Sequence, residues 1–217
     1  MPAVTNEYSG TPFLSIVAGK FVKRVEPGTP GAKERVNKLG ATVSEVHYDA
    51  WKGIVKDWSI VDGEYGKSLH VNFDDVTLSL GGKMMSEFIK KFSGAKVDQE
   101  IVVAPYDFMT DDAKRKTGMN MIQNGEKLWD FFSDYDKNTK TFSFKNGYPA
   151  PPTEWGKMTD AQKKIYYITT EEFLENYVTS HPINNIGAGS ENEPEIPTIN
   201  LDDEPTDAKK QLDEIPW

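Results

Sequence analysis

The chain has 217 residues, of which 37% are hydrophobic, and a formal net charge of −9 at pH 7. It contains no Cys, which excludes disulfides, thiolate metal sites and a Cys nucleophile. Its three His residues lie far apart in the sequence, which disfavours a His-rich metal site, and we therefore expect no cofactor.

The negative charge is concentrated at one end of the chain. Residues 191–217 contain nine acidic and two basic residues, a net charge of −7, which leaves residues 1–190 with a net charge of only −2. A body this close to neutral can present a basic groove on one face. Net charge therefore does not exclude a nucleic-acid partner.

Two features predict a soluble protein of the cytoplasm, or of the host-cell cytoplasm if the protein is viral. Residues 1–7 lack the basic start and the apolar stretch of a signal peptide. No apolar run approaches the roughly 20 residues that a membrane helix needs. We therefore expect no membrane partner.

The first 41 residues predict one strand and one long loop. Residues 13–25 are rich in Phe, Val and Ile, which favours a strand with a bulge or bend at Gly19. Residues 26–41 begin with Pro27-Gly28 and Pro30-Gly31, which are turn sequences, and we expect an exposed loop there.

Residues 54–80 predict a three-stranded meander. Apolar and polar residues alternate over 54–61, and Gly63–Gly66 supplies a hairpin turn. In the second strand, His70 and Asn72 point away from the predicted buried face, which contains Leu69, Val71 and Phe73. Residues 76–80 form a third, short strand.

A helix and two hairpins are predicted next. Five apolar residues recur at helical spacing before Ser93-Gly94 ends the helix: Met84, Met85, Phe88, Ile89 and Phe92. Residues 99–108 return to a strand, and Asn124-Gly125 is a strong signal for a two-residue hairpin turn after 119–123. Residues 128–135 and 140–145 predict a further hairpin.

This order of elements predicts the fold class and the domains. Three strands, a helix and then more strands are the order of an OB-fold β-barrel, whose helix commonly lies between strands 3 and 4. We predict a mainly β fold with such a barrel over 1–148, to which the N-terminal strand and the last hairpin are additions. Residues 149–183 form a Pro-rich connector and a helical extension, with one helix capped by Thr159 and a second that opens at Thr169. Residues 184–217 predict a disordered acidic tail.

The tail ends in an unusual sequence. Large apolar residues interrupt the charge at its tip, and an exposed Trp costs solubility. Composition alone leaves docking into a partner's pocket and chance equally open. The segment Asp213-Glu214-Ile215-Pro216-Trp217 resembles the tail tip of bacterial and phage single-stranded DNA-binding proteins, which is an acidic stretch that closes with Ile-Pro-Phe.

This resemblance implies a function and a class of partner. In that family the tip inserts its terminal aromatic residue into a hydrophobic pocket on replication and repair proteins, so the partner would be a polymerase, helicase, primase or nuclease. The partner-binding residues would be Asp213, Glu214, Ile215, Pro216 and Trp217. The departures from the family are Trp217 in place of Phe and Lys209-Lys210 within the acidic run. A phage-encoded protein matches this arrangement better than a bacterial one.

Single-strand binding without sequence preference needs aromatic platforms for the bases and a cationic groove for the phosphates. The candidate residues are Trp51, Lys52, Lys56, Trp58, Tyr65, Lys67, His70, Tyr106, Phe108, Lys114, Arg115 and Lys116. Tyr65 and Lys67 lie in the hairpin between the first two barrel strands, a loop that contacts oligonucleotides in OB-folds. For any one aromatic residue the alternative is a place in the core, and Trp58 shares a strand face with Ile54 and Ile60.

Familiar enzyme signatures are absent from the sequence. It contains no Walker A motif, no His-Glu-x-x-His and no nucleophile elbow. Residues 134–145 begin like an EF-hand loop, but Thr139 and Lys145 stand where Gly and Glu are needed, which predicts a hairpin turn. Asp107, Asp111 and Asp112 could in principle bind Mg²⁺ as in a nuclease, although solvated loop charge is the commoner role.

We therefore expect a non-catalytic protein that binds and protects single-stranded DNA during replication or recombination and recruits partners through its tail. The alternative is an OB-like adaptor that binds protein, and a metal-dependent nuclease is a distant third. Self-association and the choice between DNA and RNA are left open.

Overall fold

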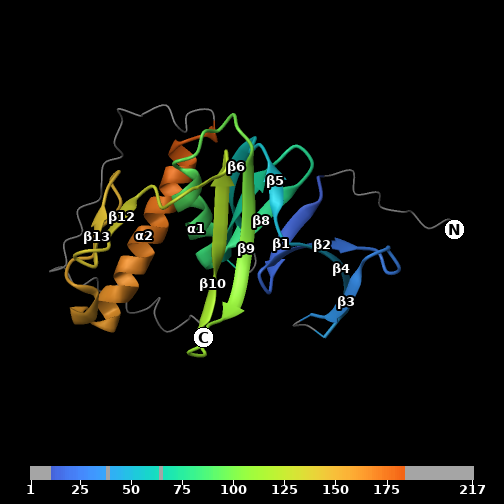
Figure 1. Ribbon diagram of the computed structural model, residues 1–217, viewed down its shortest axis with the longest axis horizontal. Coiled ribbons are helices and arrows are strands. Elements are labelled where there is room, and N and C mark those ends of the chain that lie inside the picture. Colours follow the sequence, from blue (N-terminus) through green and yellow to red (C-terminus); the bar gives the residue numbers. More distant parts are fainter. Residues whose placement is uncertain (1–10, 38–39, 64–65, 184–217) are drawn as a thin grey trace.

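The computed structural model describes residues 11–37, 40–63 and 66–183. Tyr65 and the whole tail, with the predicted partner-binding residues 213–217, lie outside the described residues. Figure 1 shows the N-terminal strands at one end, two packed sheets with a helix in the middle, and a second helix with a small hairpin at the other end.

In the described residues, the strands form two larger sheets and one hairpin. The first sheet is mixed, with the order β3 (Lys33–Val36), β4 (Thr42–Tyr48), β2 (Lys20–Val25), β1 (Phe13–Val17), β8 (Thr77–Gly81), β7 (Gly66–Asn72) and β6 (Asp57–Gly63). The second sheet has the order β11 (Glu126–Lys127), β10 (Arg115–Gln123), β9 (Ile101–Met109) and β5 (Trp51–Gly53). The third is the hairpin of β12 (Ser133–Asp136) and β13 (Thr141–Phe144).

The N-terminal region differs from its prediction. Residues 13–25 form two antiparallel strands, because Ala18 and Gly19 both have positive φ (48° and 73°) and make a tight hairpin turn. The predicted single strand with a bulge or bend at Gly19 is therefore wrong, and Gly19 is a turn residue between two strands. The predicted loop 26–41 contains β3, which pairs with β4. The Arg35 side chain donates from Nε and Nη2 to the buried Glu45 carboxylate at 2.7 Å, and this ion pair holds the short charged strand in place.

The predicted meander is confirmed as β6, β7 and β8. Antiparallel pairing sets Ile60 opposite Leu69 and Val71 opposite Leu78. Leu69, Val71 and Leu78 are fully buried, whereas His70 lies opposite Ser79 on the other face. The alternation in the sequence therefore indicated the buried face correctly.

The helix and the hairpin after the meander are confirmed too. Helix α1 (Gly82–Phe92) buries Met85, Phe88, Ile89 and Phe92 against the two sheets. Strands β9 and β10 pair antiparallel over nine residues each. Asn124 and Gly125 have φ of 53° and 80°, which is the turn geometry expected for this dipeptide, and they lead into β11.

A mainly β fold is confirmed, but the sheets are not closed into the predicted barrel. One edge of β8 pairs with β7 and the other pairs in parallel with β1. No edge of β8 is therefore left for β10, which a closed barrel would require. On the edge of β10, the Nζ atoms of Lys83 and Lys91 in α1 donate to the carbonyl oxygens of Thr117 and Met119 at 2.6 and 2.5 Å. The N-terminal hairpin and two helix lysines thus occupy the edges that a closed barrel would join.

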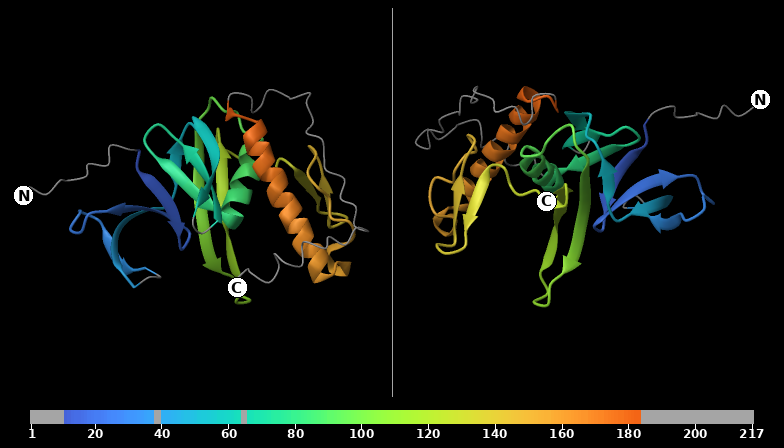
Figure 2. Two further views of the ribbon diagram at one scale, coloured as in Figure 1. Left: turned by 180° about the vertical axis from the view of Figure 1, so that it is seen from behind. Right: turned by 45° about the horizontal axis from the view of Figure 1, so that its top comes forward.

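The C-terminal third adds helix α2 (Asp160–Ser180) and the β12–β13 hairpin. Thr159 caps α2 in a capping box with Gln162, as predicted, but no second helix opens at Thr169. The Thr169 hydroxyl donates to the Ile165 carbonyl oxygen at 3.0 Å within the one continuous helix. A short 3-10 helix, η1 (Trp155–Lys157), precedes α2, and no helix in the described residues is both long and apolar enough to cross a membrane. Figure 2 shows α2 crossing the molecule beside the sheets.

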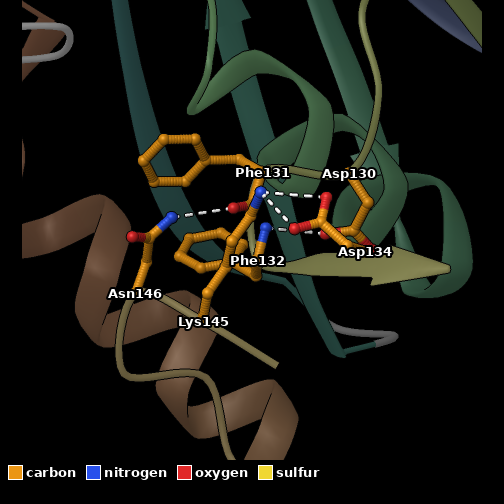
Figure 3. A network of polar contacts seen from close by, with 6 residues as sticks. All are labelled: Asp130, Phe131, Phe132, Asp134, Lys145 and Asn146. Carbon is orange, nitrogen blue, oxygen red and sulfur yellow. Dashed lines mark hydrogen bonds and ion pairs between the residues drawn. The ribbon is translucent and has the colours of Figure 1, made fainter. Parts of the chain in front are cut away.

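Polar contacts within residues 130–146 join the two ends of the β12–β13 segment (Figure 3), and the Phe131 N–H donates to the Lys90 carbonyl oxygen of α1 at 2.7 Å. The Asp130 carboxylate accepts from the Phe132 N–H at 2.8 Å, and the Asn146 side chain donates to the Phe131 carbonyl oxygen at 2.8 Å. Phe132 is fully buried between the rings of Tyr148 and of Phe173 in α2. Side chains from both sides of the predicted boundary at 148/149 therefore meet in one cluster. The turn between β12 and β13 is a hairpin turn, as predicted.

Candidate nucleic-acid interface

The hairpin of β9 and β10 has one buried face and one partly exposed face. On its inner face Ile101, Val103, Met119 and Met121 are fully buried. The other face, called here the outer face, contains Val102, Ala104, Tyr106 and Phe108 from β9 and Lys116, Gly118, Asn120 and Ile122 from β10. The turn end of this hairpin projects beyond the rest of the second sheet (Figures 1 and 2).

Two aromatic rings lie together on the outer face. The centroids of Tyr106 and Phe108 are 5.6 Å apart, and Phe108 is 50% exposed. Tyr106 lies across Gly118, where a Cβ atom would overlap the tyrosine ring and hydroxyl. A glycine at position 118 therefore makes room for the ring. Partial burial and the nearby Glu87 carboxylate raise the pKa of the Tyr106 hydroxyl, which stays neutral at physiological pH.

Three lysines lie along the outer face, one beside the two rings and two at the other end of the hairpin. Lys116 is exposed opposite Phe108, and within the described part of the chain it has no acidic partner. Lys127 in β11 lies opposite Ile122, and its Nζ is 4.6 Å from the centroid of the Trp129 ring, which is 71% exposed. Lys52 in β5 lies opposite Val102 and pairs with Glu100 at 2.8 Å.

The charges at the turn end of the hairpin are compensated by its own acids. The Arg115 side chain donates from Nε and Nη2 to the two Asp107 carboxylate oxygens at 2.8 and 2.6 Å. This bidentate pairing lowers the pKa of Asp107 and raises that of Arg115. Lys114 pairs with Asp112 at 2.7 Å, and that contact, with the Thr110 hydroxyl, lowers the pKa of Asp112.

The structure corrects the expected role of Trp58. Its side chain is only 4% exposed, its Nε1 donates to the His181 carbonyl oxygen at 2.9 Å, and its ring packs edge-on against Phe92. A ring in this position cannot stack on a base, so Trp58 belongs to the core. Trp51 lies opposite Val103, in register with the inner face, and its half-buried ring packs edge-on against Tyr48.

The remaining candidates lie away from the outer face, on or beside the first sheet. Lys56 pairs with Asp74 at 3.2 Å. Lys67 pairs with Glu175 of α2, and this contact raises the pKa of Lys67. His70 packs edge-on against Phe13 with 5.2 Å between ring centroids, and burial lowers its pKa. The structure therefore brings together Tyr106, Phe108 and Lys116, with Lys114 and Arg115 at the turn, whereas Lys52 lies on the same face at the other end of the hairpin.

Sequence reasoning missed Lys127, Trp129 and Gly118. A signal for Lys127 was present, because a two-residue turn at Asn124-Gly125 fixes the register and sets residue 127 opposite residue 122. No comparable signal exists for Trp129, which follows the short strand β11.

The chain was compared with protein-family models, with curated proteins and with solved structures, and no match was found in any of the three comparisons. Among the residues that the structure describes, no three His, Asp or Glu side chains are grouped to hold a metal ion.

Proposed function

We propose that this protein binds single-stranded DNA without catalysis and that the outer face of β9–β10 is the surface on which the strand lies. The observation that carries the proposal is the exposed pair Tyr106 and Phe108 beside Lys116, which has no acidic partner in the described residues. Bases stack on exposed aromatic rings whatever their sequence, and lysines neutralise the phosphates between them.

The arrangement of strands supports a relation to the OB-fold in an open form. The meander β6–β7–β8, helix α1 and the hairpin β9–β10 follow one another in the OB order. The first strand bends, so that β5 pairs with β9 in one sheet while β6 pairs with β7 in the other. OB-folds are partly open Greek-key barrels that bind oligonucleotides, and we propose that this chain is a variant opened by its N-terminal hairpin.

The number of lysines on the outer face without an acidic partner predicts how strongly salt should weaken DNA binding. Neutralising one phosphate of a single strand contributes about −0.7 to the slope of log Kobs against log salt concentration. Lys116 and Lys127 have no acidic partner in the described residues, so we expect a slope of about −1.4 or steeper. Lys52 must exchange Glu100 for a phosphate and should contribute less.

The test is a gel shift with labelled oligo(dT) against a duplex of equal length, over a series of salt concentrations. We expect the single strand to bind far more tightly than the duplex, with the slope given above. Equal affinity for the two at moderate salt would exclude the proposed function.

We also propose that residues 213–217 recruit a replication or recombination protein. The argument is the sequence Asp-Glu-Ile-Pro-Trp, in which one large aromatic side chain offers most of the apolar area that a short peptide can bury. Removing residues 215–217 should abolish the capture of a purified replication polymerase or helicase while oligo(dT) binding persists. Capture that survives this deletion would assign recruitment to the body.

One observation favours the adaptor alternative. Tyr135 and Phe142 on β12–β13 form a second exposed aromatic pair, with 4.9 Å between centroids and 50% and 61% exposure. Exposed aromatic residues are common at protein interfaces. An adaptor would bind its partner with little dependence on salt, and oligo(dT) would not compete.

A further inference from the structure

A cleft of about 450 Å³ lies on the side of the β9–β10 hairpin opposite to the outer face. It is bounded by β1, the β1–β2 turn, the end of β8 and the turn end of the hairpin. Its size is that of sites for small molecules, which measure about 300–1,000 Å³.

The cleft forms where strands β1 and β8 stop pairing with each other. The parallel pairing of β1 and β8 covers only two residue pairs and ends at Leu14 and Leu78. Beyond that point Ser15 and Ser79 line the cleft instead of continuing the ladder. At the far end, Gly19 of the β1–β2 turn packs on the backbone of Tyr106 and Asp107, so closely that a Cβ atom would overlap it. The cleft is thus bounded at one end by the β1–β8 pairing and at the other by the contact of Gly19 with the hairpin backbone.

The residues that line the cleft include both hydroxyl-bearing and apolar ones. Four of the lining residues carry hydroxyl groups, and none of these donates a hydrogen bond to another described residue: Ser15, Ser68, Ser79 and Thr117. Ile16, Leu80 and Met84 supply the apolar part. Such a mixture suits a flat heterocycle or a sugar, which has apolar faces and polar edges.

Arg115 and Asp107 stand in the wall of this cleft. The guanidinium group has five N–H donors, and the bidentate contact with Asp107 uses only two of them. The side chain of Arg115 remains 67% exposed, whereas that of Asp107 is only 13% exposed. The partly buried carboxylate therefore fixes the orientation of an arginine whose other donors have no partner among the described residues and can bind an oxyanion, and a fixed fork binds phosphate at a lower entropic cost.

We propose that the cleft binds one nucleotide unit of a single strand. Its phosphate would lie on Arg115, and its base or sugar would lie among the hydroxyl and apolar residues that line the cleft. This proposal rests on the proposed function, because the strand on the outer face would pass over the turn of the hairpin to reach it. The hairpin is then held from both faces by the strand that it binds.

The test is a titration of the ¹⁵N-labelled full chain with thymidine monophosphate, followed by amide chemical shifts. We expect shifts at cleft residues such as Gly19, Ser79 and Thr117, and much smaller shifts with thymidine, which lacks the phosphate. Adding oligo(dT) should move the same amides and displace the mononucleotide. Shifts confined to other surfaces, or a mononucleotide that oligo(dT) does not displace, would overturn the proposal.

Two variants sharpen the test. Arg115→Lys keeps the charge but not the fork, and we expect the mononucleotide to bind at least about tenfold more weakly, which is the loss of one charge-assisted hydrogen bond. Ser79→Leu fills the cleft from a partly buried strand position and should have a similar effect. The matched control is Arg24→Lys, which changes an exposed arginine of β2 outside the cleft in the same way. Equal mononucleotide affinity in Arg115→Lys and Arg24→Lys would contradict the proposal.

The outcomes separate this inference from the proposed function. If oligo(dT) binds far better than duplex but thymidine monophosphate leaves the cleft amides unmoved, the inference fails and the proposed function stands. If neither oligo(dT) nor the mononucleotide binds, both fail.

Discussion

Two segments of this chain carry the same mixture of aromatic and basic residues, and the fold uses them in opposite ways. In residues 51–58, Trp58 is 4% exposed and Lys56 is paired with Asp74. In residues 106–116, Phe108 is 50% exposed and Lys116 has no acidic partner in the described residues. Trp58 of the first segment belongs to the core, whereas Phe108 and Lys116 of the second are exposed to solvent.

The difference in exposure comes from the elements that pack on each strand. Helix α2 packs on β6, and the chain at its end accepts a hydrogen bond from Trp58 through the His181 carbonyl oxygen. These residues are 123 positions apart in the sequence, so no local pattern could reveal the cover. The β9–β10 hairpin extends past the neighbouring elements at its turn end (Figure 2), where Phe108 remains 50% exposed. Composition indicates which aromatic residues could stack on bases. The tertiary packing decides which of them are exposed and so able to do it.

The largest expected effect concerns stability. Trp58→Ala should lower the free energy of unfolding by about 3–5 kcal/mol, because it leaves a cavity beside Phe92 and a carbonyl oxygen without its donor. Phe108→Ala should change it by less than about 1 kcal/mol. Urea unfolding followed by fluorescence and circular dichroism measures both. Comparable losses in the two variants would mean that the outer face is covered in solution.

The second expected effect is the loss of DNA affinity. Phe108→Ala should weaken oligo(dT) binding by about 1–3 kcal/mol, which is the value of one stacked base. Phe142→Ala is the matched control, since it removes a similarly exposed member of the other aromatic pair. Fluorescence anisotropy with labelled oligo(dT) measures the two affinities. A larger loss in Phe142→Ala would move the binding surface to β12–β13.

The third expected effect is on the salt dependence of binding. Lys116→Ala should make the slope of log Kobs against log salt shallower by about 0.7, the contribution of one phosphate on a single strand. Lys56→Ala should leave the slope nearly unchanged, because Lys56 is paired with Asp74 and lies on the first sheet. Equal changes in the two slopes would show that the strand also crosses the meander.

The smallest expected effect is on stability against pH. Burial lowers the pKa of His70, so the folded chain binds a proton there less readily than the unfolded chain. Stability from this group is therefore fully present above the unfolded value of about 6.5 and declines as the pH falls below it. Urea midpoints at pH 7.5 and pH 5.5 should differ more in the parent chain than in His70→Gln. An identical pH dependence in the two would show that His70 titrates normally.

Local patterns predicted much of the fold. The spacing of Met85, Phe88 and Phe92 located α1, and strict alternation located the meander, because both signals depend on neighbours close in the sequence. Strand β3 was missed because Lys33, Glu34 and Arg35 show no alternation and the strand depends on an ion pair with β4. The open barrel was missed because the parallel contact between β1 and β8 joins segments more than 60 residues apart.

The candidate site was predicted in part, for the same reason. Tyr106, Phe108 and Lys116 were identified from their interleaving, and the register of β9 and β10 sets them on one face. Trp58 was misassigned because its cover comes from α2. The cleft beside Arg115 had no signal in the sequence, since its lining comes from β1, β7, β8, α1 and the hairpin.

The lysines of α1 that donate to the edge of β10 matter when many copies of the chain lie close together. An exposed strand edge is a template for pairing with another chain, and copies at high local concentration would meet such edges often. Lys83 and Lys91 already occupy the carbonyl oxygens of Thr117 and Met119, and each brings a positive charge to that edge. A second copy would have to break both contacts and bury two ammonium groups to add a strand there. The two lysines of α1 therefore oppose the addition of a strand along this part of the β10 edge.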